Sequence, residues 1–279
     1  MISLDPPDCT ALDAFTICIS RIQDSALRKR LAGVTQMVVD ASAAYALAAG
    51  LSQLHQIATQ TMVGGTVTRK EMEAVYTYRM ARKGAPGRHI YDELLSSVPQ
   101  GRCPLCAHRI ASTLDHHLPK ARHPALAVAP LNLVPACSDC NKIKLAYLAT
   151  SASEEPLHPY FDDIDGDSWL RAEVIEDLPA AARFYVEGPS HWDETLASRV
   201  RRHFKYLGLG QLYAAEAADE LLNVRHQLGA LHDIGGKTLV RAELQDRAAS
   251  CRAARRNGWR TAAFEAFANS EWFCDGGFS

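Results

Sequence analysis

Apolar residues recur every three or four positions along most of the chain, and alanines are frequent between them. This spacing places the apolar side chains on one face of an α-helix, and alanine favours the helical backbone. The pattern therefore predicts a mainly α protein, with helices over residues 11–32, 35–59, 69–82, 90–96, 193–206, 207–231, 237–257 and 261–271.

Local signals mark the ends of one of these helices. Thr68 precedes the helix expected at 69–82 and Glu71 stands in its first turn, so we expect Thr68 to cap that helix. The pair Gly64-Gly65 is expected to break the chain before it. The Gly- and Pro-rich run at 84–87 is expected to end it.

The helical pattern stops between residues 102 and 148. This stretch contains four cysteines, four histidines and five prolines. A small irregular module is therefore expected inside the helical protein. The expected domains are an N-terminal helical region (1–98), the module (99–150), and an acidic linker with a C-terminal helical region (151–279).

The composition is that of an ordinary globular protein, with 279 residues, 47% hydrophobic residues, 22% charged residues and a net charge of −2. The charge is nevertheless uneven along the chain. Residues 101–150 contain six Lys and Arg against two Asp, whereas residues 151–200 contain three Arg against twelve Asp and Glu. A basic centre beside an acidic stretch is typical of a polyanion site next to a region that binds none, although ordinary variation along a chain gives the same contrast.

The first residues lack the basic and apolar regions of a secretory leader. The uncharged stretch 41–68 is interrupted by Ser, Gln and His, so we expect a packed helix there rather than a membrane span. Four of the eight cysteines form two C-x-x-C pairs and four are scattered, which favours one metal site with free thiols over a disulfide framework. We therefore expect a cytoplasmic protein that does not bind a membrane.

Two C-x-x-C pairs flank a 30-residue segment that contains several histidines; the pairs are Cys103/Cys106 and Cys137/Cys140. One such turn brings two thiolates to one ion, and two turns complete the closed four-thiolate site of structural Zn²⁺. Zinc binding would also stabilise a module too small to bury a large core. The alternatives are chance pairing of buried cysteines and a redox dithiol, which would need only one pair.

A second motif overlaps the cysteine pairs. Residues 115–119 read Asp-His-His-Leu-Pro, residues 132–133 read Asn-Leu, and residues 137–144 read Cys-Ser-Asp-Cys-Asn-Lys-Ile-Lys. This order resembles the HNH endonuclease family, whose pattern is Asp-His, Pro, Asn-Leu and then C-x-x-C-Asn/His-x-x-Lys. The resemblance covers about 45 of the 279 residues. It implies a mainly α fold with an embedded small ββα-metal (HNH) module of the zinc-stapled kind.

The resemblance implies that Asp115 and Asn141 bind one catalytic Mg²⁺ or Mn²⁺. It also makes His116 the general base and Asn132 the residue that holds the loop of the base. The residue types suit these roles, because carboxylate and amide oxygens bind hard cations and histidine titrates near neutrality. The residues alone leave alternatives: Asp115 as a cap or ion-pair partner, Asn132 as a buried turn residue, and His117 as the base, since strand alternation would place Asp115 and His117 on one face.

Four basic residues near the motif are expected to contact a phosphate backbone, namely Lys120, Arg122, Lys142 and Lys144. Such contacts give affinity without reading the base sequence. Any one of them could instead be a solvated surface side chain. No recognition helix is visible, so low sequence specificity is expected.

These features predict a metal-dependent endonuclease that hydrolyses phosphodiester bonds of DNA, with RNA as an alternative substrate. A looser resemblance, which includes Leu-His-Pro-Tyr-Phe-Asp at 157–162, is to HNH proteins of bacterial anti-phage defence that work with an ATPase. It implies a defence effector with a regulatory protein partner such as an ATPase, because this chain has no P-loop motif of its own. The alternative of a different class is a non-catalytic zinc-stapled module that binds nucleic acid or protein.

Overall fold

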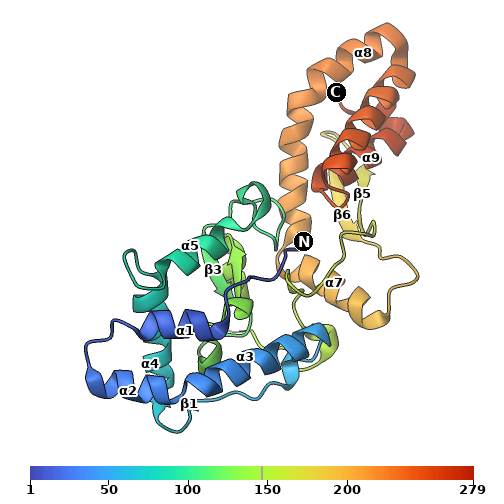
Figure 1. The fold of residues 1–279 in the computed structure, drawn as a ribbon. Helices are drawn as coiled ribbons and strands as arrows, with labels where there is room; N and C mark the ends of the chain where they lie inside the picture. Colours follow the sequence, from blue (N-terminus) through green and yellow to red (C-terminus); the bar gives the residue numbers. More distant parts are fainter. Residues whose placement is uncertain (146) are drawn as a thin grey trace. The chain divides into compact units, whose positions relative to one another are not determined.

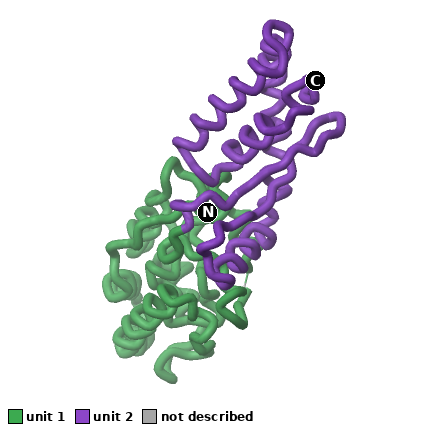
Figure 2. The backbone as a smooth tube through the Cα atoms, turned by 90° about the vertical axis from the view of Figure 1, so that its right-hand side faces the viewer, with its two compact units in different colours: residues 1–163 green, residues 164–279 purple. Residues whose placement is uncertain are grey.

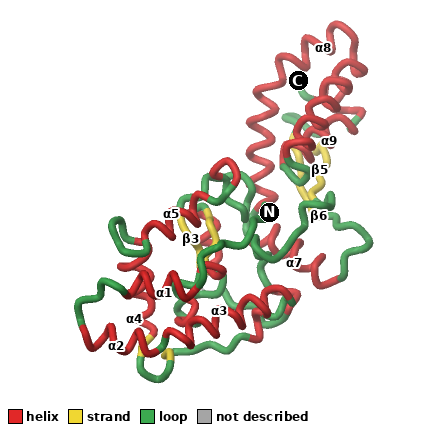
Figure 3. Tube along the Cα trace, viewed as in Figure 1, coloured by secondary structure: helices red, strands yellow, loops and turns green. Residues whose placement is uncertain are grey.

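The computed structural model describes residues 1–145 and 147–279, which form two compact units, Met1–Asp163 (unit 1) and Ile164–Ser279 (unit 2) (Figure 2). Helices are the main regular elements, and the described strands form only two-stranded antiparallel sheets (Figure 1 and Figure 3). The predicted mainly α fold is thus confirmed. Both domain boundaries expected from the sequence, at 98/99 and 150/151, lie within unit 1.

Unit 1 opens with helices α1 (Ala11–Ile19), α2 (Ser25–Gly33) and α3 (Thr35–Gly50). Helices α1 and α2 replace the single helix expected over 11–32, because the Asp24 side chain accepts a hydrogen bond from Leu27 N (3.0 Å) and starts a new helix. Helix α3 ends earlier than expected. Ser52 has a left-handed φ of 54°, which a right-handed helix cannot include.

A hairpin and further helical segments follow: β1 (Met62–Val63), β2 (Val67–Thr68), α4 (Arg69–Ala74), the π-helix η2 (Val75–Ala81) and α5 (Arg88–Ser96). Gly64 and Gly65 turn the hairpin with φ values of 58° and 65°, which glycine adopts without strain. Thr68 Oγ1 accepts a hydrogen bond from Glu71 N, and the Glu71 carboxylate accepts one from Thr68 N (2.8 Å). The predicted cap of this helix is therefore confirmed.

The cysteine-rich segment folds into two strands and a helix: β3 (Thr113–His116), β4 (Leu133–Ala136) and α6 (Ser138–Lys144). The strands pair antiparallel, with Asp115 opposite Val134 and His116 opposite Leu133. Helix α6 follows β4 directly and packs against β3. The two strands and the helix therefore meet where the motif residues are concentrated.

This segment shares its hydrophobic core with the N-terminal helices. Leu114, Leu126 and Leu133 are buried in the same apolar cluster as Phe15 of α1 and Val38 of α3. A core residue is held by the side chains that surround it, so the N-terminal helices help to fix the strands. Because of this shared core, the N-terminal helices and the cysteine-rich segment belong to one compact unit.

Unit 2 combines a β-hairpin with helices: β5 (Leu170–Ile175), β6 (Ala181–Val186), α7 (Glu194–Tyr206), α8 (Leu209–Ala254) and α9 (Trp259–Asn269). The helices lie where the sequence predicts them, and α8 is broken at Gly235 and Gly236, inside the gap expected between two helices. The hairpin is not among the expected elements. Ala182 and Phe184 are buried while Arg183 and Tyr185 are exposed, an alternation too short to stand out in an acidic stretch.

Short helical turns connect these elements: η1 (Leu54–Gln56), η3 (Pro99–Gly101), η4 (Pro124–Leu126), η5 (Pro130–Asn132), η6 (Ala152–Glu154) and the π-turn η7 (Phe273–Gly277). Two of them, η4 and η5, form the loop between β3 and β4. Among the described residues, no single helix has both the length and the apolar character of a membrane span, and α2 with α3 would meet both only as a pair bent by 43°.

Candidate functional site

Four cysteine thiols converge at one point of unit 1. The Sγ atoms of Cys103, Cys106, Cys137 and Cys140 all lie within 4.8 Å of one another, and all four residues are buried. Tetrahedral zinc with Zn–S bonds of about 2.3 Å holds its sulfurs about 3.8 Å apart, so this cluster could bind one zinc ion. Within residues 1–145 and 147–279, no other group of His, Cys, Asp and Glu has such metal-binding spacing.

Backbone turns present these thiols to one another. Arg109 N donates to Cys106 Sγ and Cys140 N donates to Cys137 Sγ, both at 3.4 Å, and such bonds stabilise a thiolate. A salt bridge from Arg109 Nε to Asp139 (3.0 Å) joins the two turns. The cysteine cluster therefore fixes the start of α6 relative to the segment before β3.

The end of β3 brings a carboxylate and an imidazole, from Asp115 and His116, into an open pocket of about 370 Å³. His116 Nε2 lies 2.8 Å from the carbonyl oxygen of Ala127. Because a carbonyl only accepts, Nε2 carries the proton and Nδ1 retains its lone pair. Burial lowers the pKa of His116 to about 3, so the ring is neutral at neutral pH and does not titrate there, contrary to the expectation from its residue type.

Asn132 connects the loop between the strands to His116. Its Oδ1 accepts a hydrogen bond from Leu118 N (2.7 Å), and its Nδ2 donates to the carbonyl oxygens of Leu118 (3.0 Å) and Leu126 (3.2 Å). Leu126 immediately precedes Ala127, whose carbonyl accepts from His116. Asn132 therefore acts on the imidazole through the backbone rather than by contact.

Asn141 lies on α6 and lines the same pocket as Asp115. Its Nδ2 donates to Thr113 Oγ1 (2.7 Å), so Oδ1 is the atom that it can offer to a cation. Burial raises the pKa of the Asp115 carboxyl, and the positive charge of Lys144 opposes that shift. The two ligands expected from the sequence are thus brought together.

Lys144 does not lie where a phosphate-binding residue would. Its side chain is 4% exposed, and its Nζ lies 3.0 Å from Asp115 Oδ2 and donates to the His116 carbonyl oxygen (2.6 Å). Lys144 stands three residues after Asn141 on α6, so both side chains face β3. The expected backbone contact is therefore corrected: this ammonium is engaged inside the protein and pairs with Asp115.

The other three basic residues are more accessible. Arg122 and Lys142 are exposed. Lys120 lines the pocket, and its Nζ lies 5.2 Å from the centre of the Tyr76 ring, close enough for a cation–π contact. These three side chains could contact phosphates at or near the pocket.

Two tyrosines that the sequence analysis missed complete the pocket wall. Tyr76 on η2 lies edge-on to His116 with ring centroids 4.4 Å apart, and its hydroxyl donates to the Leu114 carbonyl oxygen (3.4 Å). Tyr91 on α5 lines the same pocket. Both come from helices before the motif, so no motif spacing could identify them.

Comparison with known proteins finds a relative of similar length. Protein ea31 of Escherichia phage lambda is 32% identical to the chain over 237 residues, which cover 80% of this chain and 79% of the phage protein. The chain belongs to the Ea31 family. No protein-family model and no solved structure matches it.

In this Ea31 family member, His117 points away from the pocket of Asp115. Strand β3 ends at His116, and His117 N still donates to the Asn132 carbonyl oxygen (2.8 Å) in register with the β3–β4 ladder, but the His117 side chain lines a different pocket from that of Asp115. Strand alternation therefore does not bring the Asp115 and His117 side chains into one pocket. Of the two adjacent histidines, His116 is the one that shares a pocket with Asp115.

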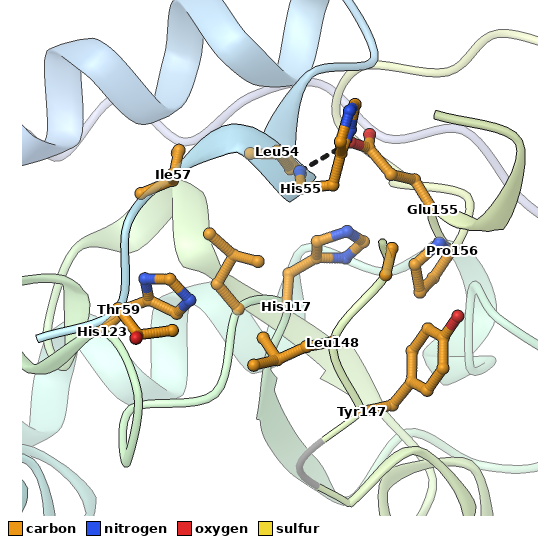
Figure 4. A pocket seen from close by; sticks show the side chains of 12 residues that line it. Leu54, His55, Ile57, Thr59, His117, His123, Tyr147, Leu148, Glu155 and Pro156 are labelled. Atoms are coloured by element: carbon orange, nitrogen blue, oxygen red, sulfur yellow. Dashed lines mark hydrogen bonds and ion pairs between the residues drawn. The ribbon is translucent and has the colours of Figure 1, made fainter. Parts of the chain in front are cut away.

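His117 lines a second, smaller pocket of about 70 Å³ (Figure 4). The Glu155 carboxylate accepts a hydrogen bond from His55 N (2.7 Å) and lies 2.6 Å from His55 Nδ1. The ring of His117 packs on that of His158, with centroids 4.2 Å apart. Burial lowers the pKa of His123, which lines the same pocket. These histidine side chains pack in the protein interior beside the candidate site and do not line it.

Proposed function

We propose that this Ea31 family member is a metal-dependent endonuclease of the HNH (ββα-metal) kind that hydrolyses phosphodiester bonds of DNA. The observation that carries the proposal is the pocket in which Asp115, His116 and Asn141 meet. The order of two antiparallel strands and a helix, β3, β4 and α6, supports it because β3 presents Asp115 and His116, and α6, which follows β4, presents Asn141. The buried cysteine cluster supports it further by anchoring α6.

The donor atoms suit one Mg²⁺ or Mn²⁺. Asp115 offers a carboxylate oxygen and Asn141 offers Oδ1, and both are hard ligands. Two protein ligands are few, which suits cations that retain water and phosphate oxygens in their coordination sphere. Bound there, the cation would offset negative charge on the scissile phosphate and on the leaving oxygen.

His116 is the proposed general base. Its neutral ring takes a proton from a water molecule at Nδ1, while Nε2–H remains bonded to the Ala127 carbonyl oxygen and stabilises the imidazolium that forms. The resulting hydroxide attacks phosphorus. The bond from phosphorus to the leaving oxygen breaks, and that oxygen takes a proton from solvent.

DNA is the proposed substrate, with RNA as the competing one. Arg122 and Lys142 are exposed and Lys120 lines the pocket, so they could contact phosphates without reading bases. Uncontrolled DNA cleavage would harm a host cell, so the proposal includes a regulatory partner, for which an ATPase is the class that the sequence resemblance implies. The expected role in anti-phage defence gains no support from the comparison, whose named relative is itself a phage protein.

Plasmid cleavage with Mg²⁺ or Mn²⁺ tests the assignment. His116→Ala and Asp115→Ala are expected to lower the cleavage rate by at least about 100-fold, because they remove the base and a metal ligand. His89→Ala, an exposed histidine on α5, is the matched control and is expected to cleave like the wild type.

Three outcomes would contradict the proposal or its assigned base. Cleavage that survives His116→Ala would remove the assigned base, and loss of cleavage in His117→Gln with normal stability would move that role to the neighbouring residue. DNA retention without cleavage under every metal and partner condition would favour the other candidate, a non-catalytic zinc-stapled binding module.

A further inference from the structure

A buried ammonium group already forms an ion pair with the carboxylate proposed as a metal ligand. The side chains of Lys144 and Asp115 are 4% and 6% exposed, and Lys144 Nζ lies 3.0 Å from Asp115 Oδ2. The same ammonium donates to the His116 carbonyl oxygen at 2.6 Å. It is therefore held from two sides, at the residue pair that ends β3.

Burial favours this ion pair in the metal-free protein over an unpaired carboxylate. A buried carboxylate without a counterion is strongly destabilising, and removing one partner of a buried pair leaves the other charge uncompensated. Lys120 lines the pocket, but its Nζ lies over the Tyr76 ring. Lys144 is thus the group that neutralises Asp115 at contact distance.

A divalent cation on Asp115 would share this carboxylate with Lys144. Two positive groups on one carboxylate repel each other, and in a largely buried site water screens that repulsion poorly. The cation would also find a ligand whose negative charge is already compensated. Both effects weaken its binding.

We propose that Lys144 is an internal counterion that competes with the divalent cation for Asp115 and so sets a low metal affinity in the isolated chain. Lys144 is a positioning residue and not a catalytic one, because it acts through Asp115. This inference rests on the proposed function, since it concerns the same metal site. The competition by Lys144 limits the activity of the site, because the isolated chain binds the divalent cation poorly at ordinary metal concentrations.

The test compares Mn²⁺ binding to the zinc-loaded full-length wild type, Lys144→Met and Lys144→Gln in mildly alkaline buffer, by calorimetry and by the electron paramagnetic resonance of free Mn²⁺. Both variants are expected to bind one Mn²⁺ at least about tenfold more tightly, because one nearby positive charge is removed. Lys142→Met, an exposed lysine on the same helix, controls for general electrostatics and is expected to match the wild type in Mn²⁺ affinity. Asp115→Asn combined with Lys144→Met is expected to lose the tightened site.

Thermal unfolding supplies a readout independent of cleavage. Without Mn²⁺, Lys144→Met is expected to melt below the wild type, and Mn²⁺ is expected to raise its melting temperature more than that of the wild type. Equal or weaker Mn²⁺ binding by both variants would overturn the inference. So would variants that are insoluble both with and without Mn²⁺, because the ion could then not replace the ammonium. Tightened Mn²⁺ binding without any DNA cleavage would refute the nuclease proposal and leave this inference standing.

Discussion

At the scale of single residues, Asn132 controls the geometry behind the candidate base. Its amide makes hydrogen bonds to both ends of the loop that runs from Leu118 to Leu126, and the residue is fully buried. A buried amide with all its bonds made defines one loop conformation, because any other would leave polar groups unsatisfied. The carbonyl that orients His116 follows this loop directly.

Replacing this amide is expected to affect stability and cleavage together. Asn132→Ala should lower the free energy of unfolding by about 2–4 kcal/mol, because the Leu118 and Leu126 backbone groups lose their partner. Asn132→Asp should cost more at neutral pH, since a carboxylate would face two carbonyl oxygens.

Urea unfolding and plasmid cleavage measure the two effects. Asn269→Ala, an exposed asparagine at the end of α9, is the control and should change stability by less than about 0.5 kcal/mol. Wild-type stability in Asn132→Ala would show that the loop does not depend on this residue.

The motif residues could be found from the sequence because their spacing reflects local geometry. Two cysteines three residues apart can only serve one ion through a tight turn, and Asn141 follows the second pair directly. The role of Lys144 could not be found in this way. It depends on how α6 faces β3, which brings Lys144 to a carboxylate 29 positions earlier in the sequence.

At the scale of elements, the Thr68 cap of α4 also connects two helices. The Glu71 carboxylate that completes the cap accepts two hydrogen bonds from the Arg30 guanidinium of α2. The hydrogen bonds from Arg30 and Thr68 lower the pKa of Glu71 to about 2. The cap and the contact between helices therefore share one charge.

This shared charge predicts a pH dependence. Because the folded pKa of Glu71 is depressed, its stabilising effect is complete above the pKa of the unfolded chain, about 4.5, and is lost as the pH falls towards 2. Glu71→Gln should therefore lower stability at neutral pH by about 1 kcal/mol, a value reduced for the exposure of the pair, and should match the wild type at the acid end.

Melting temperatures across this pH range test the prediction. Glu73→Gln removes the weaker contact to Arg69 at 3.8 Å on the same helix and should have little effect at any pH. A difference between wild type and Glu71→Gln that does not shrink on acidification would contradict the assigned cause.

The positions of the helices could be predicted from the sequence, whereas the breaks between them could be predicted less well. Periodicity over ten or more residues identifies an amphipathic helix, as for α7. The break before α2 depends on one side chain, Asp24, accepting a single hydrogen bond. The β5–β6 hairpin has six-residue strands, too short for alternation to compete with the acidic composition around it.

At the scale of the whole molecule, part of the cysteine-rich segment shares a hydrophobic core with the N-terminal helices. Residues of its strands, such as Leu114, lie in one apolar cluster with residues of helices more than 70 positions earlier in the chain, such as Phe15. Local sequence cannot show such sharing, because burial depends on partners that are distant in the chain. The expected domain limits were placed where the residue composition changes. The limits of the compact units instead depend on which residues share a hydrophobic core.

This division predicts a selective response to zinc removal. The cysteine cluster lies in unit 1, whereas all four tryptophans, Trp169, Trp192, Trp259 and Trp272, lie in unit 2. A strong chelator should reduce the helical circular dichroism signal and the melting temperature of unit 1, because structural zinc contributes directly to folding. Selectively excited tryptophan emission should remain unchanged.

Cys103→Ser should reproduce the effect of the chelator, whereas Cys251→Ser, on α8, should retain both zinc and the unit 1 transition. Metal content measured on the same samples links the spectra to the ion. A tryptophan shift that accompanies zinc release would mean that the folding of unit 2 depends on the cluster. Purified wild type without zinc, but with an unchanged unit 1 transition, would mean that hydrophobic burial alone holds β3, β4 and α6, and the cysteines would then have no structural metal to explain their convergence.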